Sequence, residues 1–247
     1  MSLKNLKFFC LSIALLCFIA CKKSSNEPDV PKTPQLTKIN SWNPGSGAEA
    51  SGLEISYDAK GNSTGILFGG ATYSATFNAA NQMSVLTGLF KQGTVSVTYT
   101  FEYNAANQLV KVIYADGGTN ANTKTISYNA AGKISKITTV YVNIAIATNT
   151  VDYTWNGDNL ATASTGTYTT TYVSFDDKLN PYSLANGIAV VFYGLPPSKN
   201  NVTEIKTVNG GITNVQKRVY EYNTAGYATS MKLTDGSNEG QKYYYAN

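Results

Sequence analysis

Thr94–Tyr103, with the sequence TVSVTYTFEY, is followed by Asn104-Ala105-Ala106-Asn107 and then by Leu109-Val110-Lys111-Val112, and this stretch decides the fold. In the first segment Val and aromatic residues alternate with Thr, Ser and Glu, so an extended strand has one apolar and one polar face. The Asn104 side chain can accept a hydrogen bond from the backbone two residues on, and Asn107 tolerates a positive φ. The stretch therefore predicts a β-hairpin with a tight turn after Tyr103.

The same turn unit recurs along the chain, mostly at steps of 20 to 26 residues. An aromatic residue is followed by Asn or Asp, two variable residues, and then Gly or Asn. Gly and Asn are the residue types that best tolerate a positive φ, which suits a hairpin that closes with a left-handed residue. The clear copies place this turn residue at Gly61, Asn81, Asn107, Gly132 and Gly226. Looser copies occur at Tyr153–Leu160, Phe175–Asn180 and Ser198–Val202.

The repeats predict an all-β fold with one β-hairpin repeat domain over residues 36–247. Eight turns at this spacing make about 14 to 17 short strands in an antiparallel up-and-down meander, and no window beyond residue 21 has a sustained helical period. Open twisted sheets rarely exceed about ten strands, and long exposed edges invite pairing between molecules. We therefore expect the sheet to curl or to close into a barrel.

The first 35 residues are predicted to target and tether the domain. Residues 1–20 carry two lysines before an apolar run of 13 residues, which is too short to span roughly 30 Å of hydrocarbon and indicates a signal peptide. Residues 18–21, Phe-Ile-Ala-Cys, resemble the bacterial lipobox, which implies lipidation of Cys21. Residues 21–35 then form a proline-containing flexible tether. An ordinary secretory signal with a chance cysteine is the alternative.

The composition excludes several classes of chemistry. The chain has 247 residues and no His, so catalytic triads and metal sites that use an imidazole are ruled out. All three cysteines lie within the first 21 residues, which excludes thiolate sites from the domain. The net charge of +4 falls to +2 without residues 1–20, which carry two lysines and no acid, and Arg218 is the only arginine. We expect no cofactor, no metal and no nucleic-acid partner.

The acidic residues offer no clear catalytic pair or calcium site. Glycoside hydrolysis needs two carboxylates about 5 to 9.5 Å apart. Asp176 and Asp177 are adjacent, and neighbouring side chains of a strand point to opposite faces. Asn156–Asn159 and Asp116–Thr119 have oxygen ligands next to Gly, but the twelve-residue calcium-loop pattern is missing. The sequence therefore predicts no catalytic residue, and turn chemistry for these acids.

Aromatic residues are the more interesting candidates for binding. Tyr and Trp rings combine a flat apolar face with a polar tip, which suits a half-exposed site for a sugar or another ligand. Trp155 is expected in a turn and is the first candidate, and Tyr172 and Tyr182 are the other two. The alternative is that cross-strand packing favours tyrosine in strands, which best explains the repeat aromatics as core residues.

The turn units also resemble those of known families. Units such as Tyr128–Ile134 are similar to the YD repeats of RHS proteins, and still more to a family of Gram-negative envelope lipoproteins whose domain is described as porin-like. Tyr153–Leu160 and Phe175–Tyr182 resemble recurrent segments of that family, and the resemblance covers residues 36–245. RHS shells enclose a toxin, but this chain is far shorter and lacks the Arg that commonly follows the turn Gly. The resemblance implies a porin-like fold, an outer-membrane location and no known activity.

Together these observations predict a non-enzymatic envelope lipoprotein that acts as a binding or scaffold module. Its expected partners are the membrane, through the lipid anchor, and a glycan or an envelope protein, and its oligomeric state stays open. A purely structural or assembly role is the alternative. A glycoside-active enzyme and an outer-membrane channel are less favoured: alternating strands also suit a porin, but the tether and the C-terminal Tyr245-Ala246-Asn247 speak against insertion.

Overall fold

The computed structural model describes residues 33–90, 96–117, 121–142, 148–185 and 187–246 of the chain. The compact unit that contains the strands begins at Pro34, and its first strand begins at Gln35, one residue before the predicted start of the domain. The expected signal peptide and Cys21 lie outside the described residues, so lipidation stays a prediction from the sequence.

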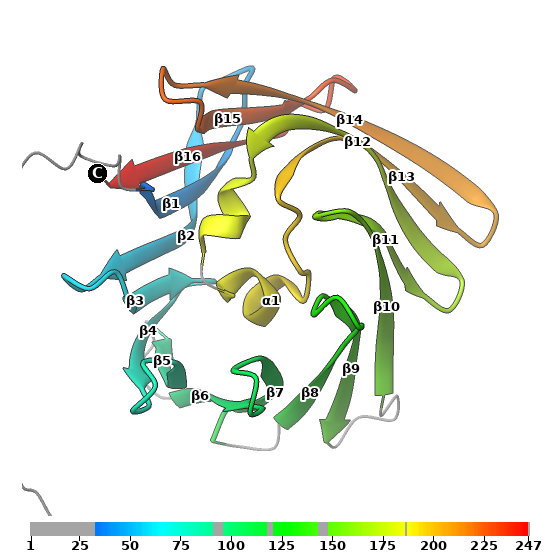
Figure 1. Cartoon of the computed structure of the whole chain (residues 1–247). Helices are drawn as coiled ribbons and strands as arrows, with labels where there is room; N and C mark the ends of the chain where they lie inside the picture. The colour runs from blue at the N-terminus through cyan, green and yellow to red at the C-terminus, as the bar shows by residue number, and fades with distance from the viewer. Residues whose placement is uncertain (1–32, 91–95, 118–120, 143–147, 186, 247) are drawn as a thin grey trace, which may run out of the picture. The chain divides into compact units, whose positions relative to one another are not determined.

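Sixteen antiparallel strands of the described residues form one closed barrel, shown in Figure 1. Each strand pairs with its neighbours in the sequence, and β16 pairs with β1 to close the sheet. The predicted up-and-down meander is therefore confirmed, and closure leaves no unpaired sheet edge. The strands are β1 Gln35–Trp42, β2 Glu49–Tyr57, β3 Ser63–Phe68, β4 Ala71–Phe77, β5 Met83–Phe90, β6 Ser96–Tyr103, β7 Leu109–Ala115, β8 Ala121–Tyr128, β9 Ile134–Val142, β10 Thr148–Asn156, β11 Asn159–Thr165, β12 Tyr168–Leu179, β13 Asn200–Asn209, β14 Ile212–Tyr222, β15 Ala228–Leu233 and β16 Gly240–Ala246.

Most of the buried residues of the barrel are apolar and face inward, and its outward face carries ion pairs between neighbouring strands together with some exposed apolar residues. In β6, Val97 and Phe101 are buried in the core, whereas Glu102 is exposed and pairs with Lys111 of β7 at 3.0 Å. Burying one large apolar side chain contributes about 1.5–3 kcal/mol, so the inward row of each strand stabilises the closed sheet. Three more ion pairs join directly opposed residues of neighbouring strands: Lys38–Glu54, Lys136–Asp152 and Lys217–Glu204.

The repeat turns have the expected backbone geometry. The φ values are 85° at Gly61, 59° at Asn81, 61° at Asn107, 73° at Gly132 and 83° at Gly226. In the turn after β8, Oδ1 of Asn129 accepts hydrogen bonds from the backbone N–H groups of Ala131 and Lys133, both at 3.0 Å. A residue with a Cβ is strained at a positive φ unless it is Asn or Asp, which explains the restricted choice at this position.

The five turns lie at one end of the barrel, which we call the repeat-turn rim. Alternate connections of an antiparallel meander share an end, so a repeat of two strands places every copy of the turn on the same rim. Neighbouring turns also contact each other: the side-chain amides of Asn62 and Asn81 exchange hydrogen bonds of 3.2 and 2.8 Å. The rim therefore links successive hairpins through side chains as well as through the sheet.

The aromatic residue of most repeat units donates a hydrogen bond to the backbone of the preceding hairpin. The Tyr103 hydroxyl donates to the carbonyl of Met83 at 2.9 Å, and the Tyr128 hydroxyl donates to the carbonyl of Leu109 at 2.8 Å. Each acceptor is the first residue of a strand in the preceding hairpin. The aromatic thus satisfies a backbone carbonyl inside the barrel, which explains why the unit favours Tyr over Phe. The same contact joins Tyr57 to Leu36, Trp155 to Ile134 and Tyr245 to Ala228.

Phe77 ends β4 in the same position of the repeat but has no hydroxyl. By the register of the other copies, Phe77→Tyr is expected to donate to the carbonyl of Ser63 and to raise the free energy of unfolding by about 0.5–1.5 kcal/mol. Tyr103→Phe is expected to lower it by a similar amount. Urea denaturation of both variants measures the two changes. A destabilised Phe77→Tyr would show that the copy at β4 has no room for the contact.

A segment between β12 and β13 leaves the sheet and occupies the interior. Residues 180–185 and 187–199, which we call the lumen segment, contain the 3₁₀-helix η1 (Pro181–Leu184) and the α-helix α1 (Ile188–Tyr193), which lies inside the ring of strands in Figure 1. The Phe192 ring of α1 lies 5.3 Å from the ring of Tyr73 in β4. Lys124 of β8 donates to the carbonyl of Val191 at 2.8 Å, and burial lowers the pKa of this lysine.

The short helix α1 is compatible with the predicted all-β fold but has no helical period in the sequence. The six residues IAVVFY are too few to show a helical period, and β-branched and aromatic residues of this kind favour a strand. The signal that was present is the pair of glycines around the helix, since Gly187 and Gly194 both have a positive φ. Within the described residues, no helix is long and apolar enough to cross a membrane.

Two of the looser repeat copies are also not hairpin turns. At Phe175–Asn180, Oδ1 of Asp176 accepts from the backbone N–H of Lys178 at 2.9 Å, but β12 continues to Leu179 with shifted pairing to β13. At Ser198–Val202 the chain runs from the lumen segment into β13 without reversing. In both places the side-chain chemistry of a turn is used to bend the chain into or out of the interior.

Candidate functional site

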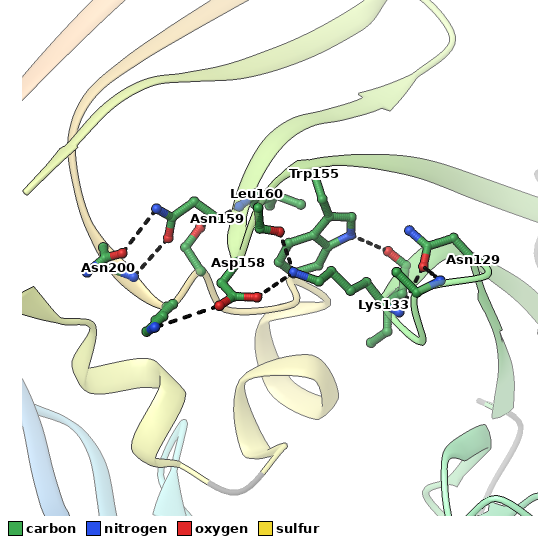
Figure 2. A network of polar contacts seen from close by, with 12 residues as sticks. Asn129, Lys133, Trp155, Asp158, Asn159, Leu160 and Asn200 are labelled. Atoms are coloured by element: carbon green, nitrogen blue, oxygen red, sulfur yellow. Dashed lines mark hydrogen bonds and ion pairs between the residues drawn. The ribbon is translucent and has the colours of Figure 1, made fainter. Parts of the chain in front are cut away.

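Trp155 was expected in a turn, but it lies at the end of strand β10. Its indole Nε1 donates to the carbonyl of Ile134 at 2.7 Å, and Nζ of Lys133 lies 5.4 Å from its ring centroid. Figure 2 shows the Lys133 side chain running along the indole to the carboxylate of Asp158. The donor of the indole is therefore used within the protein, and a cation lies over the ring. Trp155 occupies the place of the repeat aromatic that Tyr153 was expected to hold.

The turn between β10 and β11 forms a polar network with the end of the lumen segment (Figure 2). The Asp158 carboxylate lies 2.6 Å from Nζ of Lys133 and 3.7 Å from Nζ of Lys199. The hydrogen bond and the charge of Lys133 hold the pKa of Asp158 below its usual range. Asn159 and Asn200 exchange two further hydrogen bonds of 3.1 and 2.9 Å. Since two lysines neutralise the Asp158 carboxylate, the network fastens the lumen segment to the rim.

A cavity of about 230 Å³ lies between the lumen segment and residues of strands β11 to β16. We call it the tyrosine cavity; its characteristic residues are Tyr172, Tyr182, Tyr193, Tyr220, Tyr243 and Arg218. Tyr172 and Tyr182, which the sequence analysis had singled out, thus lie in one cavity, although they belong to a strand and to η1. Trp155 is not among its lining residues.

Three strands and the lumen segment position the rings of the tyrosine cavity. The strands contribute Tyr172 from β12, Tyr220 from β14 and Tyr243 from β16, and the lumen segment contributes Tyr182 and Tyr193, whose rings meet edge to face at 5.5 Å. Gln241 of β16 connects the two sides, because its amide donates to the Tyr182 hydroxyl at 2.9 Å and accepts from the Tyr243 hydroxyl at 2.8 Å.

The tyrosines of the cavity are neutral hydrogen-bonding groups. Burial raises the pKa of Tyr172 to about 12, and it also raises the pKa of Tyr182 and of Tyr243. The positive charge of Arg218 opposes the rise at all three hydroxyls. At neutral pH these phenols therefore remain protonated and can donate to a ligand or accept from it.

Arg218 of β14 is the charged group of the cavity. Its Nε and Nη2 donate to Oε1 of Gln216 at 3.0 and 2.7 Å, and its charge acts on the neighbouring Tyr220 hydroxyl. Within the described residues, no carboxylate lies within ion-pair distance of the guanidinium. From the sequence alone, Arg218 was only evidence against nucleic-acid binding. Its inward position follows from the alternation with the exposed Val215 and Val219 in the same strand.

A second hollow, of about 350 Å³, shares Arg218 with the tyrosine cavity. We call it the polar hollow; it is lined by Tyr168, Thr170, Thr207, Asn214, Gln216 and Arg218, together with Ile205. These residues occupy inward positions of β12, β13 and β14 next to the connections at the end opposite the repeat-turn rim. Arg218 therefore lies between an aromatic cavity and a polar hollow.

The other acidic candidates are engaged in local contacts. Asp176 accepts hydrogen bonds from the Tyr222 hydroxyl and from the Asn201 side-chain amide, the latter at 3.3 Å. Asp177 is exposed and pairs with Lys178 at 3.2 Å. Neither carboxylate lines the tyrosine cavity. Asp176 instead stabilises the bend at the end of β12.

Comparison with known proteins finds similarity only among solved structures. No family model matches the chain, and no curated protein matches it. A porin-like protein from Bacteroides uniformis shares 15% identity at a TM-score of 0.42, covering 85% of this chain and 98% of that one. A porin-like protein from Bacteroides vulgatus shares 9% identity at a TM-score of 0.43, covering 87% of this chain and 99% of that one. Membership of the YD-repeat or lipoprotein families stays a prediction.

Proposed function

We propose that the protein is a non-catalytic, lipid-anchored protein of the Gram-negative envelope that binds a small polar ligand in the tyrosine cavity. The observation that carries this proposal is a cavity inside a closed barrel that combines aromatic faces, neutral hydroxyls and an arginine without a carboxylate partner among the described residues. Small-molecule sites are typically concave and mostly apolar, with a few convergent polar groups that fix orientation. A glycan unit fits this description.

The charged pairs on the outer face favour a barrel that is surrounded by water, and they speak against a membrane channel. A transmembrane barrel needs an outward apolar band about 25 Å tall and a polar interior. This barrel instead carries cross-strand ion pairs such as Lys111–Glu102 and Lys136–Asp152 on its outer face, and its buried apolar core lies inside. The helix α1, with its buried residues Ile188 and Val191, also occupies part of the lumen. The space beside it is a cavity of limited volume, which favours ligand binding over conduction.

A Tyr172→Phe variant tests the binding function. The Tyr172 hydroxyl makes no hydrogen bond to another described residue, so its removal is expected to leave the melting temperature unchanged. We expect about a tenfold loss in retention of small glycans released from envelopes by mild acid, because a good hydrogen bond is worth roughly 1.4 kcal/mol. Retention by the full chain is measured by native mass spectrometry.

The matched control for this experiment is Tyr141→Phe. Tyr141 is a half-buried residue of β9 that does not line the tyrosine cavity, so its variant should retain glycans like the wild type. Equal retention by Tyr172→Phe and the wild type would contradict binding in this cavity. Failure of the wild type to retain any glycan would favour the purely structural or assembly role.

A further inference from the structure

No carboxylate of the described residues forms an ion pair with Arg218. The described ion pairs all use lysines, and the contacts of Arg218 are the neutral side chains of Gln216 and Tyr220. A partly buried cation without a counter-ion is costly, and the cost is removed when an anion binds beside it. We infer that the ligand of the tyrosine cavity carries a carboxylate, which Arg218 binds at the boundary with the polar hollow. This inference rests on the proposed binding function.

The orientation of the guanidinium suits a carboxylate. Gln216 accepts from Nε and from one hydrogen of Nη2, which holds the planar group in one orientation. A guanidinium has five N–H donors, so the hydrogens of Nη1 and the second hydrogen of Nη2 form another edge. Two parallel hydrogen bonds from such an edge match the two oxygens of a carboxylate. Gln216 is therefore the positioning residue of the anion site.

The charge balance favours a carboxylate over a phosphate. Among the residues that the structure describes, Arg218 is the only cation that lines either the tyrosine cavity or the polar hollow. The other inward cation, Lys124, donates to the carbonyl of Val191 and lines neither space. A phosphate monoester carries about −1.5 to −2 at neutral pH, so one arginine would leave it incompletely balanced, whereas a carboxylate carries a single charge. A monoanion therefore matches this site.

The size of the tyrosine cavity limits the rest of the ligand. Its volume of about 230 Å³ lies below the roughly 300–1,000 Å³ of sites for drug-sized ligands, so it accepts about one six-membered ring. Tyr172 and Tyr182 offer flat faces and hydroxyls to such a ring, and Thr170 and Asn214 offer polar groups in the hollow beyond Arg218. The ligand class is thus a ring-sized carboxylic acid, of which uronic acids and aromatic acids are two sources.

Calorimetric titration of the full chain in a polyoxyethylene detergent tests the inference. The probes are glucuronate with glucose as its neutral partner, and benzoate with benzyl alcohol as its neutral partner. We expect at least one acid to bind ten times more tightly than its partner. Arg218→Met is expected to abolish this preference. Arg218→Lys keeps the positive charge but lacks the paired N–H donors of the guanidinium, and it is expected to retain part of the preference for the acid.

A second variant keeps the test independent of folding. If Arg218→Met lowers the melting temperature, Gln216→Leu leaves the arginine in place but frees its orientation, and the preference for the acid is expected to fall at least threefold. Equal binding of both acids and their neutral partners, or a preference that persists in Arg218→Met with native melting, would overturn the inference. Tighter binding of glucose 6-phosphate than of glucuronate would also overturn it.

The result is distinguishable from failure of the proposed function. A wild-type protein that retains envelope glycans in a Tyr172-dependent way, but shows no preference for the acids, would keep the binding function and reject the carboxylate. A protein that retains no glycan and prefers neither acid would reject both. The two acids separate the sources, since glucuronate and benzoate share the carboxylate and differ in the ring.

Discussion

Gly88→Ala is expected to lower the free energy of unfolding by about 3 kcal/mol, at the upper end of the range for overpacked cores. Gly88 is buried on the inward face of β5, where it is paired with Tyr73 of β4 and Val97 of β6. A Cβ at this position would lie 2.3 Å from Cδ1 of Tyr73 and 2.9 Å from Cγ2 of Val97. Both distances are far inside van der Waals contact, so the Tyr73 ring would have to move.

The surroundings of Tyr73 make this movement costly. The ring is only 4% exposed, and it packs against the rings of Tyr99 at 6.0 Å and Phe192 of α1 at 5.3 Å. A displaced Tyr73 would therefore push on the lumen segment as well as on its own strand. Close-packed interiors transmit such strain because they contain few voids.

Urea denaturation measures the effect, and Gly65→Ala is the matched control. Gly65 lies in β3, where an added Cβ would have Ser56 as its nearest neighbour at 3.5 Å, an ordinary contact. We expect Gly65→Ala to change the free energy of unfolding by no more than about 0.5 kcal/mol. Similar stabilities for the two variants would show that the Tyr73 ring can adjust freely, against the packing described for the interior.

Local turn chemistry explains how much of the fold the sequence predicts. An Asn such as Asn104 and a left-handed residue such as Asn107 act within five residues, and the alternation in β6 acts within one strand, so both can be read without knowing the partners. The meander and its strand number follow from repeating that unit. The lumen segment does not repeat the unit. The residues of α1 are buried inside the barrel, and this environment cannot be inferred from their local sequence.

Two of the three binding candidates from the sequence, Tyr172 and Tyr182, line the proposed site, and their role in binding stays a prediction. Tyr172 and Tyr182 were found from the chemistry of the phenol ring, but nothing local shows that η1 brings Tyr182 against the strands. Trp155 was misplaced because its turn has only Gly157 and Asp158 between paired residues, shorter than the other copies. Arg218 was missed because its lack of a carboxylate partner is a property of the folded interior.

Cys21→Ala is expected to abolish labelling of the protein by a fatty-acid probe. The prediction rests on the likeness of residues 18–21 to the lipobox, in which the cysteine thiol is the acylated group. Cys17→Ala is the control, because Cys17 lies inside the apolar run that is removed with the signal peptide. Unchanged labelling of Cys21→Ala would contradict lipidation at this residue.

Loss of the acyl group is expected to have a second consequence that depends on the outer face of the barrel. Exchange of residues 1–21 for a signal peptide with an Ala-x-Ala cleavage site would export an unacylated barrel, and we expect nearly all of it in the soluble fraction. A lysine that faces lipid costs a transmembrane barrel about 2–4 kcal/mol at the bilayer midplane and about 0–1 kcal/mol near the interfaces, and Lys38, Lys111 and Lys136 all lie in outward cross-strand pairs. Because these pairs occur on separate parts of the sheet, a barrel surrounded by lipid would expose charged groups on several of its sides. An unacylated barrel that stayed with the membranes through a carbonate wash would contradict this reasoning and favour the channel.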